Sequence, residues 1–181
     1  MNIKIDKETY REMTKVQTPI AYTVGSKLYK TDTPESDLDY ILVVESSPLL
    51  ENGKKYQYTE DSFDYTIMNE ATFMQKATNG DDLVCFEAYY SNGGRKFNVA
   101  KVVRAYSGIA YRDLLQAQKL NNKKKLYHSI RCQFIAEELL QSNNINLQMC
   151  AKDAKDIVED NEIPFQIVER IVRLRSILKG N

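Results

Sequence analysis

The sequence is poor in the residues that most often build metal and nucleophile sites. It has one histidine, His128, and three cysteines, Cys85, Cys132 and Cys150, among 181 residues. The cysteines are far apart, odd in number and not at metal-ligand spacing, so a zinc site is not indicated. A single histidine also leaves little material for a histidine-dependent catalytic triad. Any chemistry is therefore expected to rest on carboxylates.

Long apolar segments and a net charge are absent as well. No stretch approaches about eighteen uninterrupted apolar residues, and MNIKIDKETYREM lacks the apolar core of a signal peptide. We therefore expect a reduced, cytoplasmic protein with no membrane partner. The formal net charge is zero, which gives no global attraction to nucleic acid. A site for polyanions would have to be local.

The order of the patterned segments predicts an α+β protein, with strands first and helices second. A capped helix is expected from Asp6 to about Lys15. Strands are expected at 20–24, 39–44, 55–59 and 63–68, with a turn at 51–53 whose Asn-Gly pair is a hairpin signal. Helical patterns follow at 70–77, 81–90, 99–119, 123–141, 147–160 and 164–179. The flexible segment 92–94 divides a predicted domain at 1–92 from a helical domain at 93–181.

Two carboxylates stand at the start of the most apolar strand. Asp37 and Asp39 are two residues apart, so in an extended chain both side chains project from one face. Such a pair is repulsive unless a cation lies between the carboxylates, and Mg²⁺ prefers oxygen ligands that it shares with substrate phosphates. A third carboxylate on a neighbouring strand would complete a two-metal site. Asp64 is favoured because alternation places it opposite the apolar face of its strand, with Glu60 and Asp61 as alternatives.

A glycine and a serine, Gly25 and Ser26, follow the strand expected at 20–24. Gly25 would let backbone N–H groups approach a phosphate, and the hydroxyl of Ser26 would add a donor. The next residues are expected to start a short helix, whose N-terminus favours an anion. Together with the carboxylates, these features predict a nucleoside triphosphate held by Mg²⁺, with attack at a phosphorus.

The stretch GSKLYKTDTPESDLDYILVV, residues 25–44, resembles the Gly-Ser…Asp-x-Asp signature of the DNA polymerase β-like nucleotidyltransferases. It is most similar to a bacterial and phage group of predicted nucleotidyltransferases with the pattern Gly-Ser-x-Ala-Tyr-Gly, then Thr-Pro-x-Ser-Asp-x-Asp. A looser similarity continues through DYTIMNEATFMQKATNGDDLVCFEAYY and KKKLYHSIR. The resemblance implies a polymerase β palm-like mixed sheet with flanking helices and a C-terminal helical half.

The resemblance also implies roles for the acidic residues. Asp37 and Asp39 would ligate two Mg²⁺ or Mn²⁺ ions, and Asp64 would ligate the catalytic ion and help to activate an acceptor hydroxyl. In-line displacement would transfer a nucleoside monophosphate from an NTP, expected to be ATP, and release pyrophosphate.

The phosphates of the NTP would be held by three residues that match the motif, Gly25, Ser26 and Ser36. Two residues depart from the group's pattern: Leu28 replaces its usual alanine, and Lys30 its usual glycine. Lys30 would either add a phosphate contact or narrow the entry to the site, so the substrate cannot be copied from the group.

A basic stripe in the helical half is a further candidate for phosphate contacts. Lys124, His128 and Arg131 follow i, i+4, i+7 spacing and share one helical face. The resemblance at KKKLYHSIR favours contact with a triphosphate or with an acceptor's phosphates, and a solvated stripe is the alternative.

Three functions remain open at this point. The first is an active nucleotidyltransferase whose acceptor is an RNA end, a protein hydroxyl or a small molecule; the zero net charge argues mildly against a large nucleic acid. The second is a catalytically silent nucleotide-binding module, or a toxin–antitoxin-type partner module, on the same fold. The third is a phosphohydrolase or phosphotransferase that uses the same metals, against which the lack of a His-Asp metal motif counts.

Overall fold

The computed structural model describes residues 2–15, 18–45, 47–159 and 165–179. The chain forms two compact units, Met1–Phe97 and Asn98–Asn181. The sequence predicts domains at 1–92 and 93–181, whereas the compact units divide after Phe97, just beyond the Asn92-Gly93-Gly94 segment. The first unit contains the strands, and the second unit is helical, as expected for an α+β protein.

The first unit is built on a five-stranded mixed sheet in the order β1-β4-β5-β3-β2. β1 runs parallel to β4 and β3 parallel to β5, while the β4–β5 and β2–β3 pairs are antiparallel. The predicted strands are confirmed, and the edge strand β1 was not predicted. The strands are β1 (Asn2–Lys4), β2 (Ile20–Thr23), β3 (Leu38–Val44), β4 (Lys55–Glu60) and β5 (Phe63–Asn69).

The turn at Asn52-Gly53 forms, with Gly53 at φ +80°, but the hairpin that it suggested is wrong. β3 and β4 are not neighbours, because β5 lies between them. The tight hairpin joins β4 to β5 instead, and its pairing ends at Glu60 and Phe63. β3 therefore pairs with a parallel strand that comes later in the chain.

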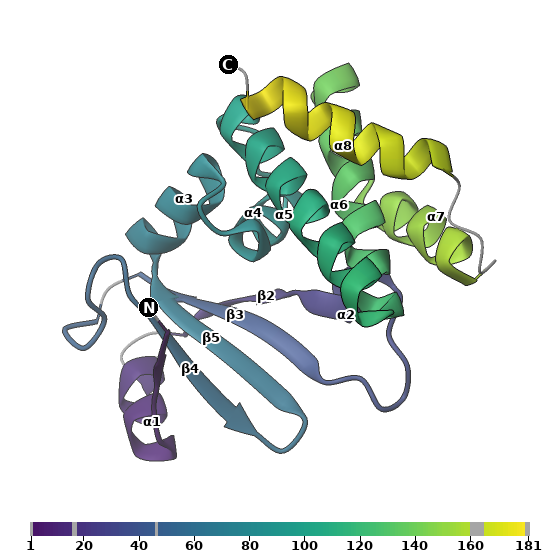
Figure 1. The fold of residues 1–181 in the computed structure, drawn as a ribbon. Coiled ribbons are helices and arrows are strands. Elements are labelled where there is room, and N and C mark those ends of the chain that lie inside the picture. The colour runs from purple at the N-terminus through teal and green to yellow at the C-terminus, as the bar shows by residue number, and fades with distance from the viewer. Residues whose placement is uncertain (1, 16–17, 46, 160–164, 180–181) are drawn as a thin grey trace. The chain divides into compact units, whose positions relative to one another are not determined.

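Each face of the sheet carries its own core. The face that includes Leu42 and Ile67 packs against α1 (Lys7–Lys15), whose first turn is capped by Asp6: the backbone N–H of Thr9 donates to Asp6 Oδ1 at 2.8 Å. The opposite face of the sheet includes Ile41, Val43 and Met68, and two helices cover this face (Figure 1). The residues of β3 from Ile41 to Val44 are buried on both faces, as the continuous apolar run predicts.

The two helices over the second face are α3 (Glu70–Asn79) and α4 (Leu83–Ser91). Their N-caps are Asn69, which accepts from the N–H of Thr72 at 2.8 Å, and Asp82, which accepts from the N–H groups of Val84 and Cys85. Gly80 ends α3 in the left-handed conformation, with φ +68°. The break between the predicted helical patterns at 70–77 and 81–90 is confirmed.

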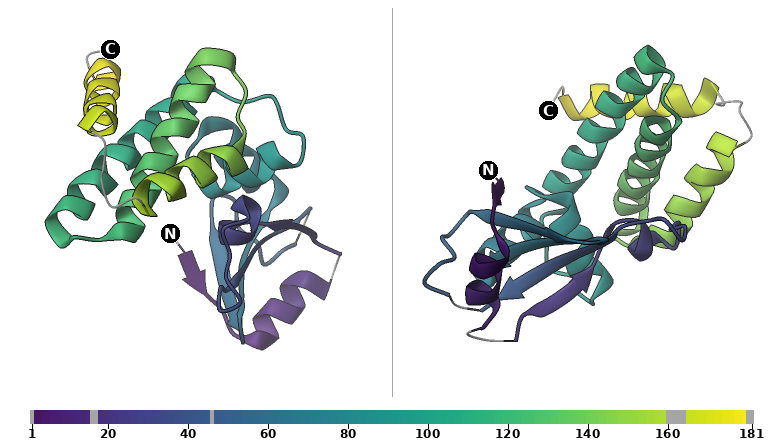
Figure 2. Two further views of the ribbon diagram at one scale, coloured as in Figure 1. Left: turned by 90° about the vertical axis from the view of Figure 1, so that its right-hand side faces the viewer. Right: turned by 90° about the horizontal axis from the view of Figure 1, so that it is seen from below.

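The second unit consists of helices in the described residues, at close to the predicted bounds. α5 and α6 form a hairpin of long helices that lie side by side in every view (Figure 2). Asp160 and Pro164, expected at the ends of the last two helices, lie outside the described residues, as does Gly180. Across the part of the chain that the structure describes, none of the helices combines the length and apolar character needed to cross a bilayer. The helices are α5 (Val99–Leu120), α6 (Lys123–Ser142), α7 (Leu147–Glu159) and α8 (Phe165–Lys179).

Candidate active site

Two of the predicted carboxylates lie opposite one another on adjacent strands. Asp39 in β3 and Asp64 in β5 are direct partners in the parallel pairing. Alternation along the two strands places both on the face of Ile41, Val43 and Met68, at the end of the sheet where that core gives way to partly exposed residues. The strand register thus creates a pair of like charges that a stable sheet would otherwise avoid.

The third carboxylate, Asp37, is exposed and precedes β3. The chain is already held beside the β4–β5 hairpin there, since the N–H of Leu38 donates to Ser62 O at 2.8 Å. Within residues 2–15, 18–45, 47–159 and 165–179, no three His, Cys, Asp or Glu side chains lie close enough together to hold a metal ion. The structure therefore brings Asp39 and Asp64 into register and leaves Asp37 outside a preformed group of three.

Gly25 lies directly against the Asp39 carboxylate. A Cβ added at position 25 would overlap Asp39 Oδ2 and lie 3.1 Å from its Cγ, and Gly25 has φ +65°. The two segments are also tied by the N–H of Val24, which donates to Asp39 O at 3.0 Å. Only glycine combines this backbone conformation with so close an approach. The Gly-Ser step therefore begins α2 (Gly25–Tyr29) immediately beside the carboxylate pair.

Ser26 and Lys30 lie at the two ends of this short helix. Ser26 is half-buried, and its carbonyl accepts from the N–H of Thr31 at 3.1 Å. Lys30 is exposed and left-handed, with φ 57° and ψ 38°. The group that the sequence resembles has glycine at this position, and a left-handed residue is where glycine costs least. The structure thus gives a backbone reason for that glycine and shows Lys30 to be a strained departure from it.

The loop between α2 and β3 is braced by Ser36. The N–H of Thr33 donates to Ser36 Oγ at 2.9 Å, and the N–H of Ser36 donates back to Thr33 O at 3.0 Å. Lys27 and Asp32 form an ion pair of 2.6 Å across the start of the same loop. Ser36 therefore fixes the turn that leads into Asp37, and its hydroxyl is already engaged.

Asp64 is held by a residue that the sequence did not indicate. Thr59, its partner in the β4–β5 pairing, donates its hydroxyl to Asp64 Oδ1 at 2.6 Å. The alternatives for a third carboxylate lie elsewhere: Glu60 pairs with Lys7 of α1 on the other face, and Asp61 is in the hairpin turn with φ 52°. A sequence reading that had placed the hairpin at 61–62 would have found Thr59.

The predicted basic stripe is divided within the helical unit. Lys124 is exposed, Arg131 is only 6% exposed, and His128 binds Asp113 of α5, with Nδ1 and Oδ2 2.5 Å apart. The three residues therefore do not share one environment. Asp113, whose side chain is fully buried, was not singled out from the sequence, because a lone carboxylate in a helix gives no signal.

A scan against protein-family models and a search of curated proteins both find no match for this chain. The sequence and the geometry described above are therefore the basis for assigning a function.

Proposed function

We propose that the unit Met1–Phe97 is a Mg²⁺-dependent nucleotidyltransferase with a polymerase β palm-like sheet. The observation that carries this proposal is the pairing of Asp39 with Asp64 on adjacent parallel strands, with Gly25 packed against the Asp39 carboxylate. Two carboxylates in register beside a glycine that begins a helix are the arrangement that a cation and the phosphates of a nucleotide would use.

The residues fit Mg²⁺, or Mn²⁺, by the chemistry of their donors. Asp39 and Asp64 offer carboxylate oxygens from one face of the sheet, and Asp37 stands two residues before Asp39 on an exposed stretch that can add a third. The repulsion between Asp39 and Asp64 would be relieved by a divalent cation between them. Such ions stabilise the attacking and leaving oxygens of an in-line displacement.

The remaining residues would hold the NTP and the acceptor. Backbone N–H groups at Gly25 and Ser26 would bind the β- and γ-phosphates, and Lys30 would reach them from the end of α2. Ser36 would act by holding the loop, because its hydroxyl is engaged within the turn. Asp64, oriented by Thr59, would accept the proton of the acceptor hydroxyl. The hydroxyl oxygen would then attack the α-phosphorus, and pyrophosphate would leave.

One observation favours a second candidate, a nucleotide-binding module without catalysis. The three aspartates do not form a group of three in the described residues, as a metal site built in advance would. In this alternative, Gly25 and Ser26 would bind a nucleotide, and the carboxylates would hold at most one loosely bound cation. The two candidates differ in whether a phosphorus–oxygen bond is broken.

The test is transfer of label from each α-labelled NTP in the presence of Mg²⁺ or Mn²⁺, with and without added RNA or cell lysate. We expect labelled product from the wild type and none from the Asp37→Ala/Asp39→Ala variant. Label transfer that persists in the double variant would refute the metal assignment. NTP-dependent thermal stabilisation without any transfer would favour the binding module, and release of inorganic phosphate from γ-labelled NTP would indicate a hydrolase.

Asp64→Asn separates binding from chemistry. The amide still accepts the Thr59 hydroxyl, so the strand pairing is kept while the charge is lost. We expect NTP binding to survive and transfer to fall to background. We also expect the variant to be slightly more stable than the wild type in EDTA, by up to about 1 kcal/mol, because one of two like charges is removed. Loss of NTP binding together with transfer would mean that the role of Asp64 is wrong.

A further inference from the structure

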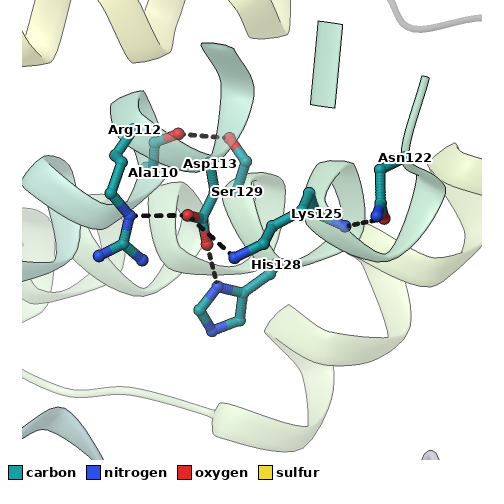
Figure 3. Close-up of polar contacts among 7 residues, drawn as sticks. All are labelled: Ala110, Arg112, Asp113, Asn122, Lys125, His128 and Ser129. Carbon is teal, nitrogen blue, oxygen red and sulfur yellow. Dashed lines mark hydrogen bonds and ion pairs between the residues drawn. The ribbon is translucent and has the colours of Figure 1, made fainter. Parts of the chain in front are cut away.

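The helical unit contains a cluster of charged side chains centred on Asp113, which the proposed nucleotidyltransferase does not use. Asp113 belongs to α5, and its side chain has no exposed surface. Three basic residues converge on its carboxylate: Arg112 Nε at 2.8 Å, Lys125 Nζ at 3.5 Å and His128 Nδ1 at 2.5 Å (Figure 3). Arg112 comes from α5, and the other two come from α6.

The cluster carries more positive charge than Asp113 needs. A buried carboxylate costs free energy unless it is paired and hydrogen-bonded, and one basic partner would balance its charge. With His128 neutral, Arg112 and Lys125 leave one positive charge in excess, and a protonated His128 leaves two. Among these four residues, the positive charge is therefore greater than one carboxylate balances.

The surplus charge lies at the surface. The side chains of Arg112, Lys125 and His128 are 56%, 39% and 37% exposed, whereas that of Asp113 is 0% exposed. Arg112 donates Nε–H to Asp113 Oδ1, and Figure 3 draws no contact from its terminal Nη groups to the other residues shown. The buried Asp113 carboxylate therefore orients the side chains of Arg112, Lys125 and His128, which are also accessible to solvent.

The position of Lys125 supports an anionic ligand. It lies in the first turn of α6, where its N–H donates to the N-cap Asn122 at 3.0 Å, and that turn has no acidic residue. Basic side chains are unfavourable at a helix N-terminus, since this end of the dipole is itself positive. Asp113 offsets part of this conflict, and an anion bound beside Lys125 would also interact favourably with this end of the helix dipole.

We propose that Arg112, Lys125 and His128 form a binding site for a phosphate monoester on the helical unit, with Asp113 as the residue that positions them. The dianionic head of a phosphate monoester matches the charge of the cluster when His128 is protonated, and its oxygens accept from guanidinium, ammonium and imidazole donors. This site lies within Asn98–Asn181 and does not depend on the proposed nucleotidyltransferase activity.

The charges of Asp113 and Arg112 are fixed by their contact. Burial raises the pKa of Asp113, but the hydrogen bonds from Arg112 and His128 outweigh it and hold the pKa below its usual value, so the carboxylate stays ionised. The hydrogen bond to Asp113 raises the pKa of Arg112. Arginine and lysine side chains keep their charge near neutral pH, so Arg112 and Lys125 supply positive charge to the site under the conditions of the test.

The experiment uses the full chain and inorganic sulfate as a probe, because sulfate is a dianion at neutral pH. Binding is measured by calorimetry and by the imidazole ¹⁵N shifts of His128. We expect sulfate to bind the wild type and to move the His128 shifts, and we expect His128→Gln to weaken this binding about tenfold. Sulfate binding by His128→Gln that is as tight as binding by the wild type would contradict the proposal.

Variants of the exposed donors separate binding from stability. Arg112→Gln and Lys125→Gln each remove one charged donor and should weaken sulfate binding about tenfold. Arg173→Gln on α8 and Lys152→Gln on α7 remove the same charges elsewhere on the unit and should leave binding nearly unchanged. Thermal unfolding of each variant shows that it is folded. Equal binding by the cluster variants and the controls would overturn the site.

The source of the phosphate is distinguished with two ligands, ribose 5-phosphate and a short 5′-phosphorylated RNA. Each is compared with its unphosphorylated form, in the wild type and in Lys125→Gln. Phosphate-dependent binding that Lys125→Gln weakens supports the site and shows whether it prefers a small molecule or a nucleic-acid end. If the phosphate adds nothing for either ligand, the proposal is wrong.

Discussion

Gly25→Ala is the most direct test of how the site is built. The added Cβ would overlap Asp39 Oδ2 and lie 3.1 Å from Cγ and 3.3 Å from Cβ of Asp39. These atoms belong to a residue of β3 that pairs with Asp64 of β5 on one side and accepts the N–H of Val24 on the other. The carboxylate therefore has to rotate or move by roughly 1 Å to regain an ordinary contact distance.

Two costs add in this variant. A non-glycine residue in the left-handed region, as at φ +65°, costs about 1–2 kcal/mol. Displacing the Asp39 carboxylate costs little stability, because this end of the strand is partly exposed, but it moves a proposed metal ligand. A misplacement of about 1 Å lowers the rate of an enzyme by about 100-fold. We therefore expect a modest loss of stability and a large loss of nucleotide transfer.

Gly53→Ala is the matched control. Gly53 has φ +80° in the same unit, and a Cβ there would meet nothing within 4 Å. Both variants should lose similar free energy of unfolding, measured in urea, while only Gly25→Ala loses label transfer and Mg²⁺-dependent thermal stabilisation. If Gly25→Ala keeps both of these, the contact between Gly25 and Asp39 does not shape the site and the reasoning fails.

Three further substitutions test individual contacts. Lys30→Gly should stabilise the protein by about 1 kcal/mol in urea, because it relieves a left-handed lysine, and should weaken NTP binding if Lys30 contacts phosphate. Asp82→Asn keeps a cap for α4 and loses the ion pair with Lys55, so it should cost about 1 kcal/mol at pH 7. Burial raises the pKa of Asp82, but the ion pair with Lys55 outweighs burial and lowers this pKa in the folded protein. The loss of unfolding free energy in Asp82→Asn should therefore be complete above about pH 4 and should vanish as the pH falls through the lowered pKa of the folded state. Thr59→Val removes the hydroxyl that holds Asp64, and label transfer should fall on the order of tenfold while urea unfolding changes little, since residue 59 is exposed.

The parts of the fold that the sequence predicted are those set by local signals. The structure has β3 at the apolar run 39–44, a cap for α1 at Asp6, and breaks between helices at Gly80 and 92–94. Each of these signals acts through neighbouring residues. The pairing of the strands was not local. An Asn-Gly pair between two strands suggested a hairpin, yet β3 pairs in parallel with β5 along its whole length, from Leu38 to Val44.

The candidate site divides in the same way. Gly25, Asp39 and Asp64 could be singled out because a motif and an alternating pattern mark them, and the structure brings these three together. Thr59 was missed because it contacts Asp64 only once the hairpin turn between them is placed at 61–62. Asp113 could not be found, because it matters only through a partner on another helix, 15 residues away. For His128 the pattern gave a helical face but not the neighbouring helix that binds it.

The carboxylate pair depends on the core behind it. Ile67 and Met68 are both fully buried, and they lie on opposite faces of β5. A slip of one residue between β3 and β5 would send each side chain of the slipped strand to the wrong face, which would expose both cores and move Asp64 away from Asp39. Repulsion between two opposed carboxylates costs only about 0.2–1 kcal/mol, whereas exposing the side chain of Ile67 or of Met68 costs about 1.5–3 kcal/mol. The register that aligns Asp39 with Asp64 is therefore maintained by the hydrophobic core, and a repulsion of that size between the two carboxylates is too small to shift it.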